Sequence, residues 1–185
     1  MSTARSKALQ TSSAADLWDE LAAGAAAESP LWGEAVRPDP EREPVFSLLA
    51  PPEHALGVET IYEGYLVHFA RPRLFAPTDA DTALLLGDYL YAHGLVRISE
   101  RGDVDAVRDL AELISLCAQA RADGRDDDGA AWAATAALLG TGELEDARVA
   151  LRDNRDPGPL DRLARGAAGD AAVERALAAH SRRLR

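Results

Sequence analysis

The spacing of hydrophobic residues along the chain predicts helices throughout. Apolar side chains between Pro51 and Ala70 recur at steps of three and four, the period of one helix face. The prolines at 51 and 52 suit a first helical turn, and Pro72 ends the run. The segment 80–99 is apolar on nearly every side, which is typical of a helix in the middle of a bundle. Further helices are expected over 14–27, 104–122, 130–139, 143–152, 160–165 and 170–184.

Prolines, glycines and charged residues divide the chain into four segments. Residues 1–12 are small and polar, and we expect them to be a disordered tail. Residues 13–50 hold one helix, capped by Ser13, and a linker over 31–44 that is too rich in proline to be regular. Residues 51–124 are expected to form a central helical bundle, and the helices within 125–185 to pack on the same domain.

Composition supports an all-α fold and narrows the class of partner. Alanine, the best helix former, accounts for 38 of the 185 residues, and aromatic residues for only 5%. The net charge of −11 argues against nucleic-acid binding and against attachment to an anionic membrane surface. No run approaches the roughly 20 apolar residues of a membrane span, and the first residues do not resemble a secretory signal. We therefore expect a cytoplasmic protein.

Few residues suggest catalysis or metal binding. The four histidines are dispersed and form no His-x-x-x-His pair. Cys117 lies on the apolar stripe of its helix, the usual place of a core cysteine. Carboxylates at 126–128 could coordinate Mg²⁺, but the neighbouring glycines and Arg125 favour a solvated turn at a helix N-terminus. We expect no catalytic residue, no metal site and no cofactor.

Gly87 and Asp88 interrupt the most apolar helix of the chain. A glycine inside a helix costs about 1 kcal/mol relative to alanine, and a buried carboxylate needs a partner. Gly64 interrupts the preceding helix in the same way. Our interpretation is close helix packing at these glycines and a structural polar core in which Asp88 pairs with His68 or with an arginine.

Three segments, taken together, resemble the trans-type polyprenyl diphosphate synthases. The sequence LLGDYL at 85–90 resembles the family's LxGDxL helix. The segment 58–68 is similar to the helix that leads into the family's first aspartate-rich motif. Its matching positions are Glu59, Ile61, Leu66 and His68. The sequence LAELIS at 110–115 resembles a later helix of the family. The resemblance extends over residues 53–124, about two fifths of the chain, and implies part of the isoprenoid synthase fold.

The departures from the family concern its chemistry. Its three metal-binding aspartates fall on Phe69, Ala70 and Arg73, none of which can hold Mg²⁺. The second aspartate-rich motif has no counterpart, and active members are roughly twice as long. The resemblance therefore implies a helical framework without its catalytic ligands, and disfavours an active synthase.

Three functions follow as hypotheses. The family includes heterodimers in which a smaller, degenerate subunit binds a catalytic one. The resemblance thus implies a non-catalytic subunit or regulator of a prenyl diphosphate synthase. This hypothesis predicts an apolar surface patch over 53–122 and a protein partner, either a synthase subunit or a second copy. Alternatively, the bundle binds a prenyl chain or quinone, or the protein is a general helical adaptor. The ligand-binding hypothesis predicts an apolar pocket lined by Leu66, Phe69, Leu84, Tyr89 and Leu113.

Overall fold

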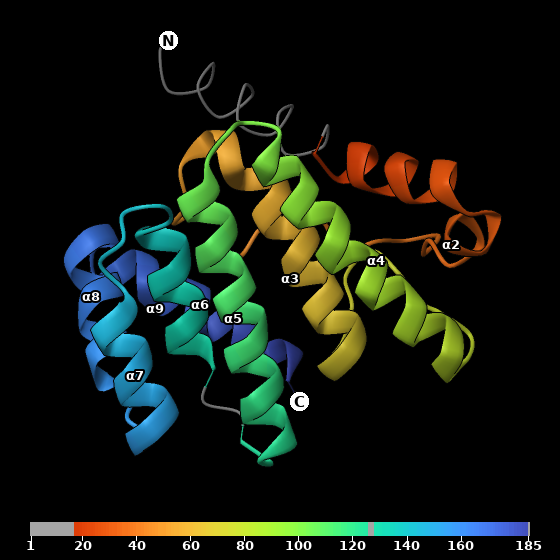
Figure 1. Cartoon of the computed structure of the whole chain (residues 1–185). Helices are drawn as coiled ribbons and strands as arrows, with labels where there is room; N and C mark the ends of the chain where they lie inside the picture. Colours follow the sequence, from red (N-terminus) through yellow and green to blue (C-terminus); the bar gives the residue numbers. More distant parts are fainter. Residues whose placement is uncertain (1–16, 126–127, 185) are drawn as a thin grey trace, which may run out of the picture.

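The computed structural model describes residues 17–125 and 128–184 (Figure 1). Regular structure in these residues is helical, apart from an isolated bridge between Val36 and Phe75. None of these helices is long and apolar enough to cross a membrane. The elements are a helix over 17–28, α2 (Pro30–Glu34), the 3-10 helix η1 (Pro52–His54), α3 (Ala55–Phe69), α4 (Ala80–Ser99), α5 (Val104–Ala122), α6 (Gly129–Ala137), α7 (Glu145–Asn154), α8 (Gly158–Ala168) and α9 (Asp170–Arg183).

Helices α4 and α5 begin and end at the residues expected from the sequence. The side chain of Asp79 accepts a hydrogen bond from the Thr82 amide at 2.8 Å, and Asp103 accepts one from the Ala106 amide at 2.9 Å. Each carboxylate satisfies one of the amides that a helix start leaves unpaired. Gly102 adopts a positive φ of 76° between the two helices, a conformation that suits glycine. Local signals therefore determine these boundaries.

The sequence suggested that the proline-rich segment 31–44 is irregular throughout, but part of it is helical. It contains most of α2, whose first residue is Pro30 and whose cap is Ser29. Proline is compatible with this position because the first helical amide has no partner within the helix. The last four helices lie within two or three residues of their expected ranges. The expected tail over 1–12 lies outside the described residues.

Helices α3 and α4 form an antiparallel pair in which glycines face one another. A Cβ added to Gly64 would lie 3.0 Å from the carbonyl oxygen of Gly87, and one added to Gly94 would lie 3.0 Å from that of Gly57. The ring of His68 packs directly over Gly87. The close helix packing expected at Gly64 and Gly87 is confirmed, and a second pair, Gly57 and Gly94, extends it one heptad away on each helix.

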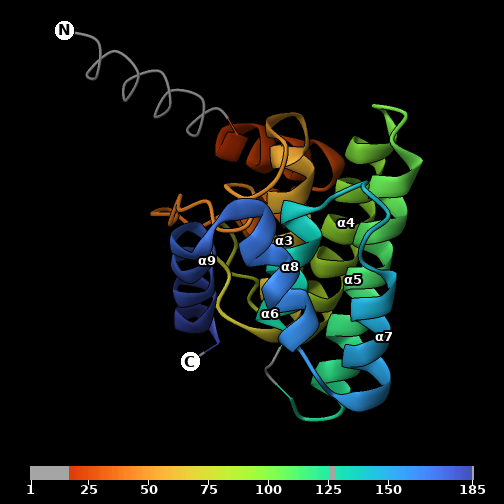
Figure 2. The same ribbon diagram turned by 90° about the vertical axis from the view of Figure 1, so that its left-hand side faces the viewer.

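The buried side chains form two hydrophobic clusters. The larger cluster combines residues of α3, α5 and α6 to α9 with Ile98 of α4 and with Val45 and Phe46, so the central and C-terminal segments share a core. The smaller cluster joins the helix over 17–28 to Leu74, Phe75, Leu86 and Leu90. Figures 1 and 2 show the helix over 17–28 and α2 at the edge of the molecule, beside α4 and away from α6 to α9.

Helix α4 is not in the middle of the bundle, contrary to the expectation from its composition. Leu86, Leu90 and Ile98 point into the protein and are fully buried. Leu84 and Leu85, however, are 56% and 59% exposed, and Val96 is 50% exposed. One face of α4 therefore carries large apolar side chains into solvent.

Candidate functional site

The candidate functional site is the exposed apolar face of α4, defined by Leu84, Leu85 and Val96. Single hydrophobic side chains are common on protein surfaces, whereas a contiguous apolar patch marks an interaction site. Leu84 and Leu85 are adjacent, and Val96 lies about three turns further along α4, beyond the exposed Asp88. Phe69, at the end of α3, is also 38% exposed. Because α3 and α4 are antiparallel, the end of α3 lies at the same end of the pair as Leu84 and Leu85. This face can bind apolar groups of another molecule.

The polar pair His68 and Asp88 borders this face. His68 Nε2 lies 3.3 Å from Asp88 Oδ1, and this contact lacks the alignment of a hydrogen bond. Burial lowers the pKa of His68, against the opposing influence of the Asp88 carboxylate. Of the two partners expected for Asp88, His68 or an arginine, His68 is its neighbour, but no hydrogen bond joins the pair. The expected place of Asp88 in the core is wrong, because its side chain is 65% exposed. A surface carboxylate needs no core partner, since water solvates it.

The five residues expected to line an apolar pocket do not meet around one cavity. Leu66 and Leu113 are buried in the larger cluster, and Tyr89 packs against the smaller one. Phe69 and Leu84 reach solvent instead. Among the described residues, cavities of about 550, 270 and 310 Å³ are lined by other side chains. The largest of these lies between α5 and α7 and is rimmed by charged groups such as Glu112 and Arg152.

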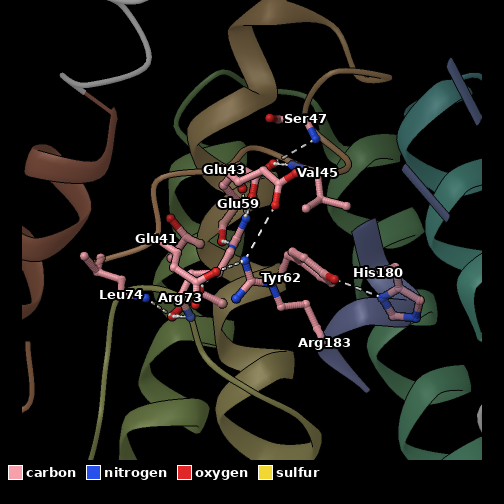
Figure 3. A network of polar contacts seen from close by, with 12 residues as sticks. Glu41, Glu43, Val45, Ser47, Glu59, Tyr62, Arg73, Leu74, His180 and Arg183 are labelled. Atoms are coloured by element: carbon pink, nitrogen blue, oxygen red, sulfur yellow. Dashed lines mark hydrogen bonds and ion pairs between the residues drawn. The ribbon is translucent and has the colours of Figure 1, made fainter. Parts of the chain in front are cut away.

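A buried ionic network lies between α3 and the segment that follows it (Figure 3). Glu59, Glu63 and Arg73 have no solvent-exposed surface in their side chains. Arg73 donates to Glu59 at 2.5 Å and to Glu63 at 2.9 Å. Burial by itself would lower the pKa of Arg73, but the two carboxylates outweigh it and raise that pKa. All three ionised groups are therefore engaged with one another.

Backbone amides supply the rest of the network's hydrogen bonds. Glu59 accepts from the amides of Val45 and Ser47 at 2.9 and 3.1 Å. Glu63 accepts from three consecutive amides, beginning at Arg73, at 2.8, 2.7 and 3.4 Å. These contacts satisfy the negative charge that one guanidinium cannot neutralise. The network attaches the loop at 45–47 and the loop at 73–75 to α3. Because every charged group in it is already paired, we assign it a structural role.

This network was not predicted from the sequence. The signal was present, because Glu59 and Glu63 are four residues apart on an otherwise apolar helix and so share one face. Arg73 was considered only as a poor replacement for a metal-binding aspartate. The structure instead places its guanidinium over the rings of Trp18 and Tyr62, at 4.5 and 4.8 Å.

A second polar chain connects α3 to the C-terminal helix. The hydroxyl of Tyr62 lies 2.9 Å from His180 Nδ1, and His180 Nε2 lies 3.3 Å from Asp128. Asp128 also accepts a hydrogen bond from Arg121 at 3.0 Å, and Arg121 donates to the Tyr65 hydroxyl. Burial raises the pKa of both tyrosines. With the side chains of Tyr62, His180 and Asp128 almost fully buried, this arrangement fixes α9 to the core.

Asp128 therefore departs from the expectation of a solvated acidic turn. Its side chain is buried next to Arg121 and His180, and the positive charge of Arg121 together with the contacts to both side chains holds it inside. Residues 126 and 127, the rest of that acidic run, lie outside the described residues. Cys117 is buried as expected, and burial raises the pKa of its thiol. The part of the chain that the structure describes holds no group of three His, Cys, Asp or Glu placed to bind a metal ion.

The Asp128 cluster predicts a specific pH dependence of stability. Burial alone would raise the pKa of Asp128, but the hydrogen bond from His180 and the charge of Arg121 outweigh it and lower that pKa. A carboxyl with a lowered pKa stabilises the fold above its ordinary pKa of 3.8, and this stabilisation is lost as pH falls toward the folded value. We expect Asp128→Asn to flatten the acid side of a urea-unfolding profile measured from pH 3 to 7.

The matched control is Asp153→Asn, because Asp153 is an exposed carboxylate on α7. This variant should retain the acid-side slope of the unmodified protein. Equal slopes for the Asp128 and Asp153 variants would show that Asp128 does not contribute to acid sensitivity.

The chain matches no protein-family model, no curated protein and no solved structure at a significant level. The resemblance described above thus rests on the three sequence segments alone.

Proposed function

We propose that this protein is a non-catalytic, polyprenyl-synthase-like helical protein that acts as a subunit or regulator of a prenyl diphosphate synthase. The observation that carries the proposal is the outer face of α4, where Leu84, Leu85 and Val96 are each at least half exposed. Exposing such side chains to water is unfavourable, by about 25 cal/mol for each Å² of apolar surface. A partner protein that covers them recovers this free energy.

The buried ionic network supports a non-catalytic role. Arg73 stands where the resemblance would place the third metal-binding aspartate of the synthases. Its guanidinium brings a fixed positive charge to a position where the family's chemistry uses carboxylates to bind Mg²⁺. The nearby carboxylates of Glu59 and Glu63 are engaged by this guanidinium and by backbone amides. They are therefore not available to bind Mg²⁺.

The test is a binding measurement with a purified, full-length prenyl diphosphate synthase from the same genome. We expect the unmodified protein to co-elute with the synthase in size-exclusion chromatography. The double variant Leu84→Asp, Leu85→Asp should bind at least tenfold more weakly, because it places two charges in the apolar contact. Both positions are exposed, so the variant should fold normally, as circular dichroism can establish.

Leu48→Asp is the matched control, because Leu48 is 71% exposed but lies outside α4. It should bind the synthase like the unmodified protein. The proposal is wrong if the unmodified protein does not bind, or if the two sets of substitutions weaken binding equally. Incorporation of labelled isopentenyl diphosphate by the purified protein alone would contradict the non-catalytic role.

A further inference from the structure

The helix over 17–28 and α2 are attached to the protein through their own small hydrophobic cluster. Trp18, Leu21 and Ala25 belong to one cluster with Leu86 and Leu90 of α4 and with Ala35, Leu74 and Phe75, and none of these side chains belongs to the larger core. Segments that bury few apolar side chains in a separate cluster open more easily than the rest of a protein. We call residues 17–34 the N-terminal strap.

The polar contacts beneath the strap are incompletely paired. Three buried polar atoms there have no hydrogen-bond partner, namely Trp18 Nε1, His93 Nε2 and Arg97 Nε. The interface also contains an ion pair between Glu20 and Arg97 at 2.7 Å, with Glu20 more than half exposed. Buried groups without partners weaken an interface, and exposed ion pairs add little to it.

The strap also has a natural point of attachment. Beyond it, Arg37 donates its amide to the Leu74 carbonyl at 2.9 Å, and Glu41 donates to Arg73 at 3.1 Å. The amide of Ala76 likewise donates to the carbonyl of Ala35 at 2.7 Å. These backbone hydrogen bonds hold residues 35–41 against the segment that follows α3, and the amides of Ala35 and Val36 also donate to the carbonyls of Leu31 and Gly33 at the end of the strap. The chain can therefore bend where the strap ends.

Opening of the strap would uncover a second apolar face of α4. Leu86 and Leu90 are fully buried beneath it, and Leu86 follows directly on the exposed Leu84 and Leu85. The ring of Trp18 would also leave the guanidinium of Arg73. The apolar surface of α4 would then extend around the helix.

We propose that the N-terminal strap opens as a unit while the rest of the protein stays folded, and that it thereby regulates access to α4. We infer the opening because the strap packs in a hydrophobic cluster separate from the main core and because three buried polar atoms at its interface have no hydrogen-bond partner. The regulatory role also rests on the proposed function, because it requires a partner that binds α4.

Native-state thiol labelling tests the opening, with Cys117 as the internal reference. Ala25→Cys places a thiol beneath the strap, at a position that is 1% exposed, whereas Cys117 is fully buried in the main core. Each thiol reacts with an aromatic disulfide reagent only when it becomes exposed. We expect the introduced thiol to react at least 100-fold faster than Cys117, with a weaker dependence on urea, as peptide mass spectrometry can follow.

Equal labelling rates with equal urea dependence would overturn the proposal, because the strap would then open only on global unfolding. Leu21→Cys gives a second position in the same interface should Ala25→Cys fold poorly. For the regulatory role, Leu21→Ala weakens the strap alone and should strengthen binding to the synthase at least threefold. If Leu21→Ala makes the thiol of Ala25→Cys react faster but leaves binding to the synthase unchanged, the regulatory role is wrong. A synthase that does not bind at all would contradict the proposed function but not the opening.

Discussion

Replacing Arg73 with methionine is expected to destabilise the protein strongly. The variant would leave Glu59 and Glu63 buried without a cationic partner, although their side chains have no access to water. Removing one member of a buried ion pair typically costs about 3–5 kcal/mol, because the remaining charge is neither paired nor solvated. Urea unfolding followed by circular dichroism should show a loss of this size.

The surface pair of Arg152 and Glu112 provides the matched control. Its N–O distance is 3.0 Å, similar to those in the buried network, but both side chains are more than 40% exposed. Arg152→Met should therefore change the free energy of unfolding by only about 0–1 kcal/mol. A loss below about 1 kcal/mol for Arg73→Met as well would show that water reaches the network and that the pairing is of little consequence.

Neutralising the two carboxylates should restore part of the stability lost in Arg73→Met. Glu59→Gln and Glu63→Gln remove the charges but retain an oxygen that can accept from the amides of Val45 and Leu74. The triple variant should be more stable than Arg73→Met alone, because no uncompensated charge stays buried. A triple variant that is less stable still would mean that the carboxylate charge itself holds the loops.

The sequence predicted the elements that local chemistry determines. Helices α4 and α5 have their expected bounds, and each starts at a capping aspartate, Asp79 or Asp103, that lies within three residues of the amide it accepts from. Helix α2 was missed, because five residues give too short a pattern, and Pro30 together with the prolines that follow α2 suggested a loop. The all-α class followed from composition and helical period together.

The orientation of side chains could not be read from the sequence in the same way. A helix with apolar residues on every side, such as α4, does not indicate which face is covered, so Leu84 was assigned to a pocket and Asp88 to the core. The partner of Glu59 and Glu63 lies on a loop ten or more residues away, and only the folded chain brings Arg73 between them. The exposed face of α4 likewise depends on where the N-terminal strap packs.

The second large effect is expected at the glycines between α3 and α4. A Cβ at position 94 would lie 3.0 Å from the carbonyl oxygen of Gly57 and closer still to Cγ1 of Ile61. The backbone oxygen cannot rotate away, so the two helices would have to separate. We expect Gly94→Ala to destabilise the protein by about 1–3 kcal/mol, the usual cost of overpacking a core.

The direction of the stability change at Gly94 distinguishes a steric conflict from intrinsic helix propensity. Alanine is intrinsically better than glycine in a helix by about 1 kcal/mol, so without a steric conflict the substitution should stabilise the protein. Gly166 in α8 provides this comparison, because no atom lies within 4 Å of its added Cβ. Thermal unfolding should show a lower midpoint for Gly94→Ala and a higher one for Gly166→Ala. If both variants are stabilised, α3 and α4 do not approach as closely as their glycines require, and the surface of α4 on which the proposed function depends would be arranged differently.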